Sequence, residues 1–367
     1  MAETTIEKRP YKDFSRGVHS AGKVVKAQLE LTYKCNLHCV HCYTDPYNSA
    51  EYFPRELQTS EIKRIIDELA DYGVLWLSFS GGEALKRKDF FEIYDYAFKK
   101  GFVLVIFTNG TCFTPAVIER LKAQPPFFID VSCHSVREEA FDRFTQVPGS
   151  FRKFMDGMEL LRRSGLPFRL KTKAMNWNKD EIPEIRKYVQ SFNVEFGFTT
   201  SLSPRLNGDV SSLEHRLAPA DIKELETRED IWKNDEESCA VSRGRLGAPS
   251  DALYRCGCGT DTVHISAWGE LGTCTLEYES RASLRTFSVR EAVEKVFNEI
   301  KSLRFSSESA CGTCEIHGFC ERSPTAIRRQ TGDREQPDAY RCDVALDRAE
   351  RLTKTTLEHP LAARRNS

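Results

Sequence analysis

The stretch Lys34-Cys-Asn-Leu-His-Cys-Val-His-Cys-Tyr43 places Cys35, Cys39 and Cys42 on one short segment. Three thiolates can hold three corners of a four-iron cluster and leave the fourth iron open. A structural zinc ion takes four closed ligands and a ferredoxin-type cluster takes four cysteines, so a triplet with no partner close by indicates a cluster that binds something else. A structural zinc site, to which His38 and His41 could contribute, and redox-active cysteines are the alternatives.

The spacing of the triplet and the aromatic residue after it resemble the signature of the radical SAM enzymes, and His38 and His41 occupy variable positions of that signature. The resemblance implies that the open iron is chelated by S-adenosylmethionine and that one-electron reduction then yields a 5′-deoxyadenosyl radical. It also implies that Tyr43 lies against the adenine and that an electron donor such as flavodoxin or ferredoxin is needed.

Around this segment, short β-rich runs alternate with amphipathic helical stretches up to about residue 200. The predicted strands are 24–33, 74–79, 103–108, 127–132, 168–174 and 195–200, and the predicted helices start at Thr59-Ser60, 89, Thr114-Pro115, 150, 180 and 218. Six such units predict an α/β fold, either an open doubly wound sheet or a partly closed barrel. The resemblance, which covers most of 25–230, implies a partial (β/α)6 TIM-like barrel with an open side for substrate.

Polar motifs follow the predicted strands at their carboxyl ends, where parallel sheets carry their active groups. Gly81-Gly82-Glu83 follows the second strand, and Glu83 is the expected partner of the ammonium group of S-adenosylmethionine. Gly81 and Gly82 would let the backbone approach the cofactor closely. The resembled family has Gly-Gly-Glu-Pro here, whereas this chain has Ala84 in place of the proline. A glycine loop with a solvated acid is the alternative.

Asn109 and Ser132 end the next two strands and could bond the ribose or the methionine carboxylate. Lys171 and Lys173 on the fifth strand could supply a cation to the cofactor. Lysines at alternating strand positions are more often solvated outward groups, which is the competing interpretation of both.

A second group of cysteines lies near the C-terminus, where Cys311-x2-Cys314-x5-Cys320 and the distant Cys342 suit either zinc or an iron–sulfur cluster. With Cys256, Cys258 and Cys274, the pattern resembles the SPASM domain, which holds two auxiliary four-iron clusters. The resemblance implies an outer cluster on the first four cysteines and an inner one on Cys274 with Cys256, Cys258 or both. The usual fourth inner ligand falls at Pro324, so the inner cluster has either both of these cysteines or an open iron.

These patterns divide the chain into five predicted segments. They are an N-terminal tail (1–23), the partial barrel (24–230), a bridging region (231–255), a C-terminal cysteine-rich loop and α+β auxiliary-cluster domain (256–345) and a C-terminal tail (346–367).

Composition restricts the partners and the compartment. The 53 basic and 54 acidic residues nearly cancel, which argues against a nucleic-acid or anionic-membrane partner. Hydrophobic residues make up 40% of the chain, yet every long apolar run is interrupted, so no membrane span is expected. The start has no apolar signal segment, and 13 cysteines in a reducing cytoplasm favour metal ligation over disulfides.

Enzymes with this two-part layout mostly modify peptides or proteins, which makes a maturase of a ribosomally made peptide the first hypothesis. Only about twenty residues precede the first strand, too few for an independent leader-binding domain, so leader recognition would need a separate protein or the barrel surface. Sulfatase-maturing members carry an aspartate after the inner cysteine, whereas Thr275 stands here. The alternatives are a small-molecule step toward a quinone or modified-haem cofactor and a non-catalytic metal scaffold.

Overall fold

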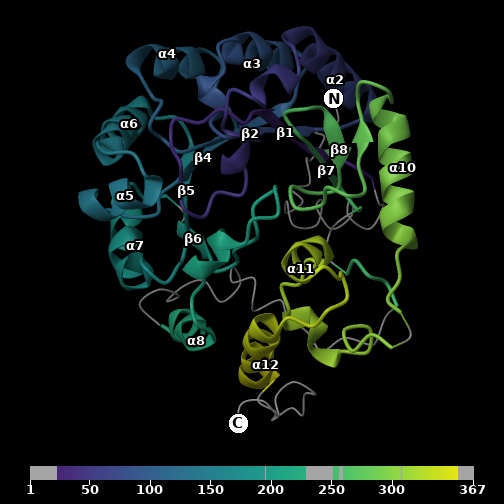
Figure 1. Cartoon of the computed structure of the whole chain (residues 1–367). Coiled ribbons are helices and arrows are strands. Elements are labelled where there is room, and N and C mark those ends of the chain that lie inside the picture. Colours follow the sequence, from purple (N-terminus) through teal and green to yellow (C-terminus); the bar gives the residue numbers. More distant parts are fainter. Residues whose placement is uncertain (1–22, 195, 229–250, 256–258, 307, 354–367) are drawn as a thin grey trace, which may run out of the picture.

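The computed structural model describes residues 23–194, 196–228, 251–255, 259–306 and 308–353 (Figure 1). The strands are β1 (Lys26–Thr32), β2 (Trp76–Gly81), β3 (Val103–Thr108), β4 (Phe128–Ser132), β5 (Phe168–Lys173), β6 (Phe196–Thr199), β7 (Thr262–Ile265), β8 (Glu270–Gly272) and β9 (Ala282–Ser283). The helices are α2 (Thr59–Tyr72), α3 (Phe90–Lys99), α4 (Pro115–Ala123), α5 (Glu138–Thr145), α6 (Ser150–Ser164), α7 (Ile182–Gln190), α8 (Pro219–Thr227), α10 (Val289–Ser302), α11 (Pro324–Thr331) and α12 (Ala339–Thr353).

The described strands form one nine-stranded sheet in the order β6-β5-β4-β3-β2-β1-β7-β8-β9. Every neighbouring pair from β6 to β7 is parallel, and the two pairs beyond β7 are antiparallel. The sheet curves into an open arc with helices along its outer side (Figure 1). The predicted alternation of six strands and helices is therefore confirmed, and the strand order gives a barrel that does not close.

Helix α2 shows why these elements form where they do. Ile62, Ile65, Ile66 and Leu69 recur at the helical period, and all four are buried against the sheet. Gly73 ends the helix with a φ of 101°, a left-handed conformation that glycine adopts without steric cost. The helix starts at the predicted Thr59, and Glu61 turns back to accept a hydrogen bond from the Gln58 backbone N–H at 2.7 Å.

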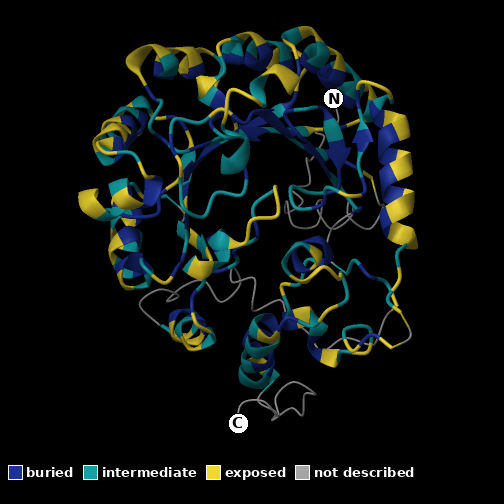
Figure 2. Cartoon of the chain, viewed as in Figure 1, coloured by how far each residue is buried: buried dark blue, intermediate teal, exposed yellow. Residues whose placement is uncertain are grey.

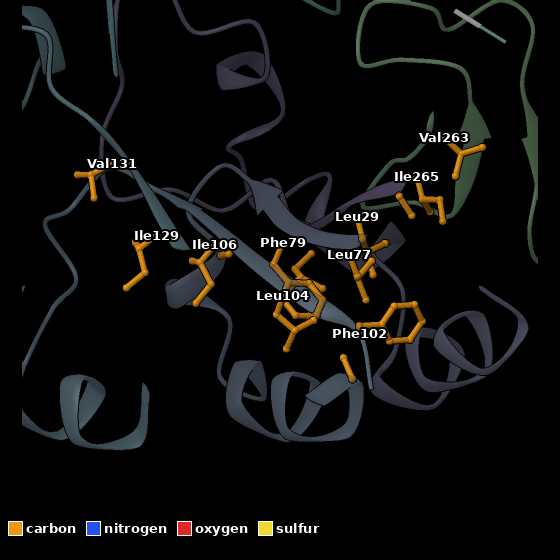
Figure 3. Packing of buried hydrophobic residues seen from close by; sticks show 14 of the residues in the cluster. Leu29, Leu77, Phe79, Phe102, Leu104, Ile106, Ile129, Val131, Val263 and Ile265 are labelled. Carbon is orange, nitrogen blue, oxygen red and sulfur yellow. The ribbon is translucent and has the colours of Figure 1, made fainter. Parts of the chain in front are cut away.

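The core lies between the outer face of the sheet and the helices. Side chains of one strand face, among them Leu29, Leu77, Phe79, Leu104 and Ile106, point toward the helices (Figure 3). The helices bury the faces turned to the sheet and expose the opposite ones (Figure 2). The inner face is polar at the matching positions, where the Gln28 side chain donates to Ser80 Oγ at 3.2 Å. Polar side chains of β1 and β2 therefore lie on the concave side of the sheet, where a substrate could contact them.

Helix α5 and the strands β7, β8 and β9 were not predicted from the sequence. Helix α5 buries Phe141 and Phe144, three residues apart, and strands β7 to β9 continue the barrel sheet. Strand β7 pairs in parallel with β1 across Lys26 to Leu29, so the sheet continues beyond the predicted boundary at residue 256. The division into domains otherwise stays a prediction, and most of 231–255 lies outside the described residues.

The predicted start of the C-terminal tail at residue 346 is wrong. Helix α12 continues to Thr353, because Leu346 and Ala349 are buried against Ile316 and Phe319 in a small separate core. In the part of the chain that the structure describes, no helix is both long enough and apolar enough to cross a membrane.

Candidate active site

The loop that carries Cys35, Cys39 and Cys42 leaves the carboxyl end of β1 and is held from two sides. Asn48 Oδ1 accepts from the Cys35 backbone N–H at 3.0 Å, and Asn48 Nδ2 donates to the Cys35 carbonyl at 3.2 Å. The backbone N–H groups of His38 and Val40 donate to carbonyls at the end of α5 at 2.9 and 3.1 Å. The unpredicted helix α5 therefore fixes the loop that the chemistry needs.

The two glycines of the second motif seat the β2 loop directly on this segment. The Gly82 N–H donates to the Thr32 carbonyl at 2.8 Å, and the Glu83 N–H donates to the Lys34 carbonyl at 3.0 Å. A Cβ atom on Gly81 would lie 2.1 Å from the Thr32 carbonyl oxygen, and one on Gly82 would lie 2.5 Å from the Tyr33 carbonyl oxygen. Glycine is required here for an approach of backbone to backbone beside Cys35, in addition to any approach to the cofactor.

Glu83 is 1% exposed, and its carboxylate joins the ends of β2 and β3. It accepts hydrogen bonds from Thr108 Oγ1 at 3.0 Å, the Asn109 N–H at 2.8 Å and the Leu85 N–H at 3.2 Å. Burial raises the pKa of Glu83, and these donors oppose the shift by stabilising the charged form. The sequence did not reveal this bracing role. The predicted contact with the cofactor ammonium stays a prediction.

Replacement of Glu83 by alanine is expected to weaken S-adenosylmethionine binding and to lower the free energy of unfolding by about 1–3 kcal/mol, because buried donors lose their acceptor. Glu83→Gln keeps an oxygen acceptor but removes the charge, so it separates the two roles. Calorimetric titration with the cofactor and thermal unfolding measure them. Glu92→Gln, on an exposed helix face paired with Lys63, is the control. An unchanged dissociation constant in both Glu83 variants would remove this carboxylate from the cofactor site.

Asn109 is placed beside the triplet, as predicted for a residue at the end of β3. Its Nδ2 lies 3.7 Å from Cys35 Sγ and 3.3 Å from Asn36 Oδ1. Cys112 is half-buried near the same loop, and its Sγ lies 3.5 Å from Asn36 Oδ1. Cys133, by contrast, is fully buried in the core.

Three of the remaining predicted cofactor residues, Tyr43, Lys171 and Lys173, have protein partners in the structure. The Tyr43 hydroxyl donates to Glu30 Oε1 at 3.1 Å, and Lys173 Nζ donates to the Ser201 carbonyl at 2.9 Å. Lys171 Nζ forms an ion pair with Asp130 Oδ2 at 2.5 Å, and Ser132 is exposed at the end of β4. The structure thus brings Glu83 and Asn109 to the triplet, whereas the cofactor roles of Ser132, Lys171 and Lys173 stay predictions.

The three thiols sit in surroundings that suit metal ligation more than free reactivity. Burial raises the pKa of Cys35 to about 12, and it also raises the pKa of Cys39 and of Cys42. Such thiols stay protonated near neutral pH until a metal displaces the proton. The donor set, three cysteines on one braced loop, fits a four-iron cluster with one open corner.

The C-terminal cysteines Cys311, Cys314, Cys320 and Cys342 line one cavity of about 610 Å³, here called the cysteine cavity. Cys314 and Cys320 flank the short 3-10 helix Glu315–Phe319, and Cys342 comes from α12, which packs on that helix. Burial raises the pKa of Cys320 to about 11 and that of Cys342 to about 12. The structure therefore brings together the four residues that were predicted to form one outer site.

The inner set is only partly described. Cys274 follows β8 and is half-buried, while Cys256 and Cys258 lie outside the described residues. Pro324 is buried as the first residue of α11, whose N-terminus is capped by Ser323 Oγ at 3.4 Å from the Ala326 nitrogen. Pro324, which stands at the position of the usual fourth inner ligand, therefore begins a helix and provides no ligand.

Asn36, Asn48 and Thr108 support the site, and sequence reasoning missed all three. Thr108 stood beside the predicted Asn109 and could have been found from its place at a strand end. Asn48 is thirteen residues from Cys35, and no local pattern links them.

The comparisons agree with this geometry. Residues 29–189 match the family model described as the Radical SAM superfamily. The AdoMet-dependent heme synthase of Methanosarcina barkeri is 29% identical over 335 residues, which cover 85% of this chain and 94% of that protein. The mycofactocin maturase MftC of Mycolicibacterium smegmatis is 26% identical over 334 residues, 88% of this chain and 83% of that protein. Streptococcus suis SuiB bound to its precursor peptide SuiA superposes with a TM-score of 0.66 at 16% identity, covering 94% of this chain and 84% of that one.

An open, mostly parallel α/β barrel with a cysteine triplet at the end of its first strand defines a radical SAM enzyme. Residues 29–189 therefore form a radical SAM domain, which uses S-adenosylmethionine and a four-iron cluster. When bound, this pair supplies a carbon-centred radical that abstracts hydrogen from a substrate. The protein orients the cofactor through the braced triplet loop and the glycine loop seated on it.

Proposed function

We propose that the chain is a maturase that abstracts a hydrogen atom from a residue of a ribosomally made peptide and so forms a crosslink, a thioether, an excision product or an oxidised side chain. The observation that carries the proposal is the combination of the braced triplet with the cysteine cavity, a two-site layout suited to removing a hydrogen atom and then an electron. Support comes from the similarity to MftC, whose name describes it as a maturase.

The cysteine cavity is proposed to hold an auxiliary four-iron cluster. Among the described residues, no three His, Cys, Asp or Glu side chains converge closely enough to ligate one metal ion. A structural zinc ion needs all four sulfurs within about 2.3 Å of one point, whereas the corners of a cluster lie further apart. Four cysteines that line one cavity supply a ligand set for such a cluster. The inner cluster on Cys256, Cys258 and Cys274 completes the proposal.

The partners and the compartment follow from this chemistry. A one-electron donor such as flavodoxin or ferredoxin reduces the first cluster, and a separate leader-binding protein delivers the peptide. The proposed compartment is the cytoplasm, where free thiolates persist for cluster assembly. A nucleic-acid or membrane partner has no part in the proposal, because the charges nearly balance at 53 basic and 54 acidic residues.

A small-molecule substrate is the second candidate. The observation that favours it is the similarity to the AdoMet-dependent heme synthase of Methanosarcina barkeri. The aligned region covers 94% of that protein, against 83% of MftC from Mycolicibacterium smegmatis. A carboxylate-bearing iron porphyrin is the substrate class that this relationship suggests.

The test is an anaerobic assay of the reconstituted chain with S-adenosylmethionine and dithionite. Two substrates are compared: a precursor peptide encoded beside the gene, with its leader-binding protein where one is present, and a carboxylate-bearing iron porphyrin. We expect 5′-deoxyadenosine to rise with the peptide and the peptide mass to change. A rise with the porphyrin alone, with a mass change in the porphyrin, would replace the peptide proposal by the second candidate.

A further inference from the structure

The cysteine cavity is lined by three arginines from separate segments, Arg255, Arg322 and Arg341. Two carboxylates, Glu315 and Asp338, also line it, and Asp338 Oδ2 lies 3.2 Å from Arg341 Nε. Positive charge therefore exceeds negative charge in the cavity before any cysteine is ionised. Three guanidinium groups around four cysteines suit an anionic occupant of the cavity.

The guanidinium groups are fixed in place by the backbone around the cavity. Arg341 is 8% exposed, and its Nη1 donates to the Glu321 carbonyl at 2.5 Å. Arg255 Nη2 donates to the Gly312 carbonyl, next to Cys311, at 2.6 Å. Arg322 donates to the Arg334 carbonyl through Nη2. Each of the three arginines is therefore held by a hydrogen bond from a terminal guanidinium nitrogen to a backbone carbonyl.

The Nε groups of Arg322 and Arg341 are buried without a hydrogen bond among the described residues. Arg341 Nε lies beside Asp338, whereas Arg322 is bonded only through Nη2, to the Arg334 carbonyl, in the part of the chain that the structure describes. The Arg322 guanidinium also stacks over the Phe305 ring at 5.1 Å, and Arg255 stacks over the same ring at 5.0 Å. A buried N–H without an acceptor costs about 1–3 kcal/mol, which an acceptor inside the cavity would recover.

We propose that Arg322 and Arg341, assisted by Arg255, are tuning residues that raise the reduction potential of the cluster in the cysteine cavity and make it the acceptor of the substrate electron. The inference rests on the proposed outer cluster. A cluster bound by four thiolates is anionic and gains one more negative charge on reduction, so fixed positive charge and N–H donors favour its reduced form. In the overall balance, the substrate radical loses one electron, the cluster gains it, and a one-electron acceptor protein of the flavodoxin or ferredoxin class removes it afterwards.

The experiment is an anaerobic potentiometric titration of the reconstituted full-length chain, followed by electron paramagnetic resonance. The Cys314→Ala variant identifies the outer signal by its disappearance. We expect Arg322→Gln and Arg341→Gln to make reduction of that cluster about tenfold less favourable, a fall of about 59 mV for one electron. The triplet cluster should keep its midpoint. Arg137→Gln, an exposed arginine paired with Glu184 on the barrel exterior, should change nothing.

The Arg322→Lys variant separates the effect of the positive charge from the effect of a disturbed structure, because lysine keeps the charge and loses the planar guanidinium group. A smaller fall for lysine than for glutamine, or an outer cluster kept with lysine and lost with glutamine, would support the proposal. Unchanged midpoints in both glutamine variants with iron retained, or equal loss of iron in the lysine and glutamine variants, would overturn it. If Cys314→Ala removes no signal at all, the proposed outer cluster fails instead.

Discussion

Simultaneous replacement of Cys35, Cys39 and Cys42 by alanine is expected to abolish formation of 5′-deoxyadenosine and to remove about four irons from each chain. The open iron that would chelate the cofactor is lost with the triplet. The cysteine cavity lies on a separate segment and should keep its iron. Iron analysis, sulfide analysis and chromatography of the nucleoside products measure the result.

The control for this variant is Cys133→Ala, which removes a thiol from the barrel core without touching the triplet. It should retain full iron content and full cofactor cleavage, apart from a modest loss of thermal stability from the small cavity. Cofactor cleavage that persists in the triple variant would disprove the assignment of the triplet. Loss of all iron would show instead that the C-terminal cysteines hold no cluster of their own.

Replacement of Gly82 by alanine is the second change with a large expected effect. The new Cβ would lie 2.5 Å from the Tyr33 carbonyl oxygen and 2.8 Å from the Lys34 carbonyl oxygen, and both belong to backbone that leads straight into Cys35. Because neither group can rotate away, the β2 loop and the triplet loop must separate. A displacement of about 1 Å at a reacting centre costs about a hundredfold in rate, so we expect cofactor cleavage to fall by that factor.

Gly197→Ala is the matched control, because a Cβ at that position of β6 meets nothing within 4 Å. Cleavage rate and cofactor dissociation constant should be measured for both variants, together with circular dichroism to confirm the fold. If Gly82→Ala cleaves the cofactor at the rate of the unmodified chain, the glycine loop is not what sets the position of the triplet.

The two predictions test different parts of one arrangement. The cysteines supply the ligands, whereas the glycine loop and Glu83 set where those ligands stand relative to the end of β3. Asn109 connects both, since its backbone N–H donates to Glu83 and its side chain lies 3.7 Å from Cys35 Sγ. The triplet loop, the glycine loop with Glu83 and the end of β3 therefore have to keep their relative positions for one cluster to bind the cofactor.

The sequence alone determined the ligand residues and the repeating βα units. The triplet spacing, the helical periods and the strand-end motifs are local patterns, and local patterns can be recognised from the order of residues along the chain. The same alternation left two arrangements open, a doubly wound sheet and a partly closed barrel, and the structure decided between them with the sequential order β6-β5-β4-β3-β2-β1.

Only the tertiary structure decided which distant groups support those ligands. The bracing of the triplet loop by Asn48 and α5, the burial of Glu83 under Thr108 and the pairing of β7 with β1 all join residues that no local pattern links. The arginines of the cysteine cavity converge in the same way from separate segments. The physical reason is that a hydrogen bond or an ion pair depends on distance in space, which folding sets, whereas a motif depends on distance along the chain.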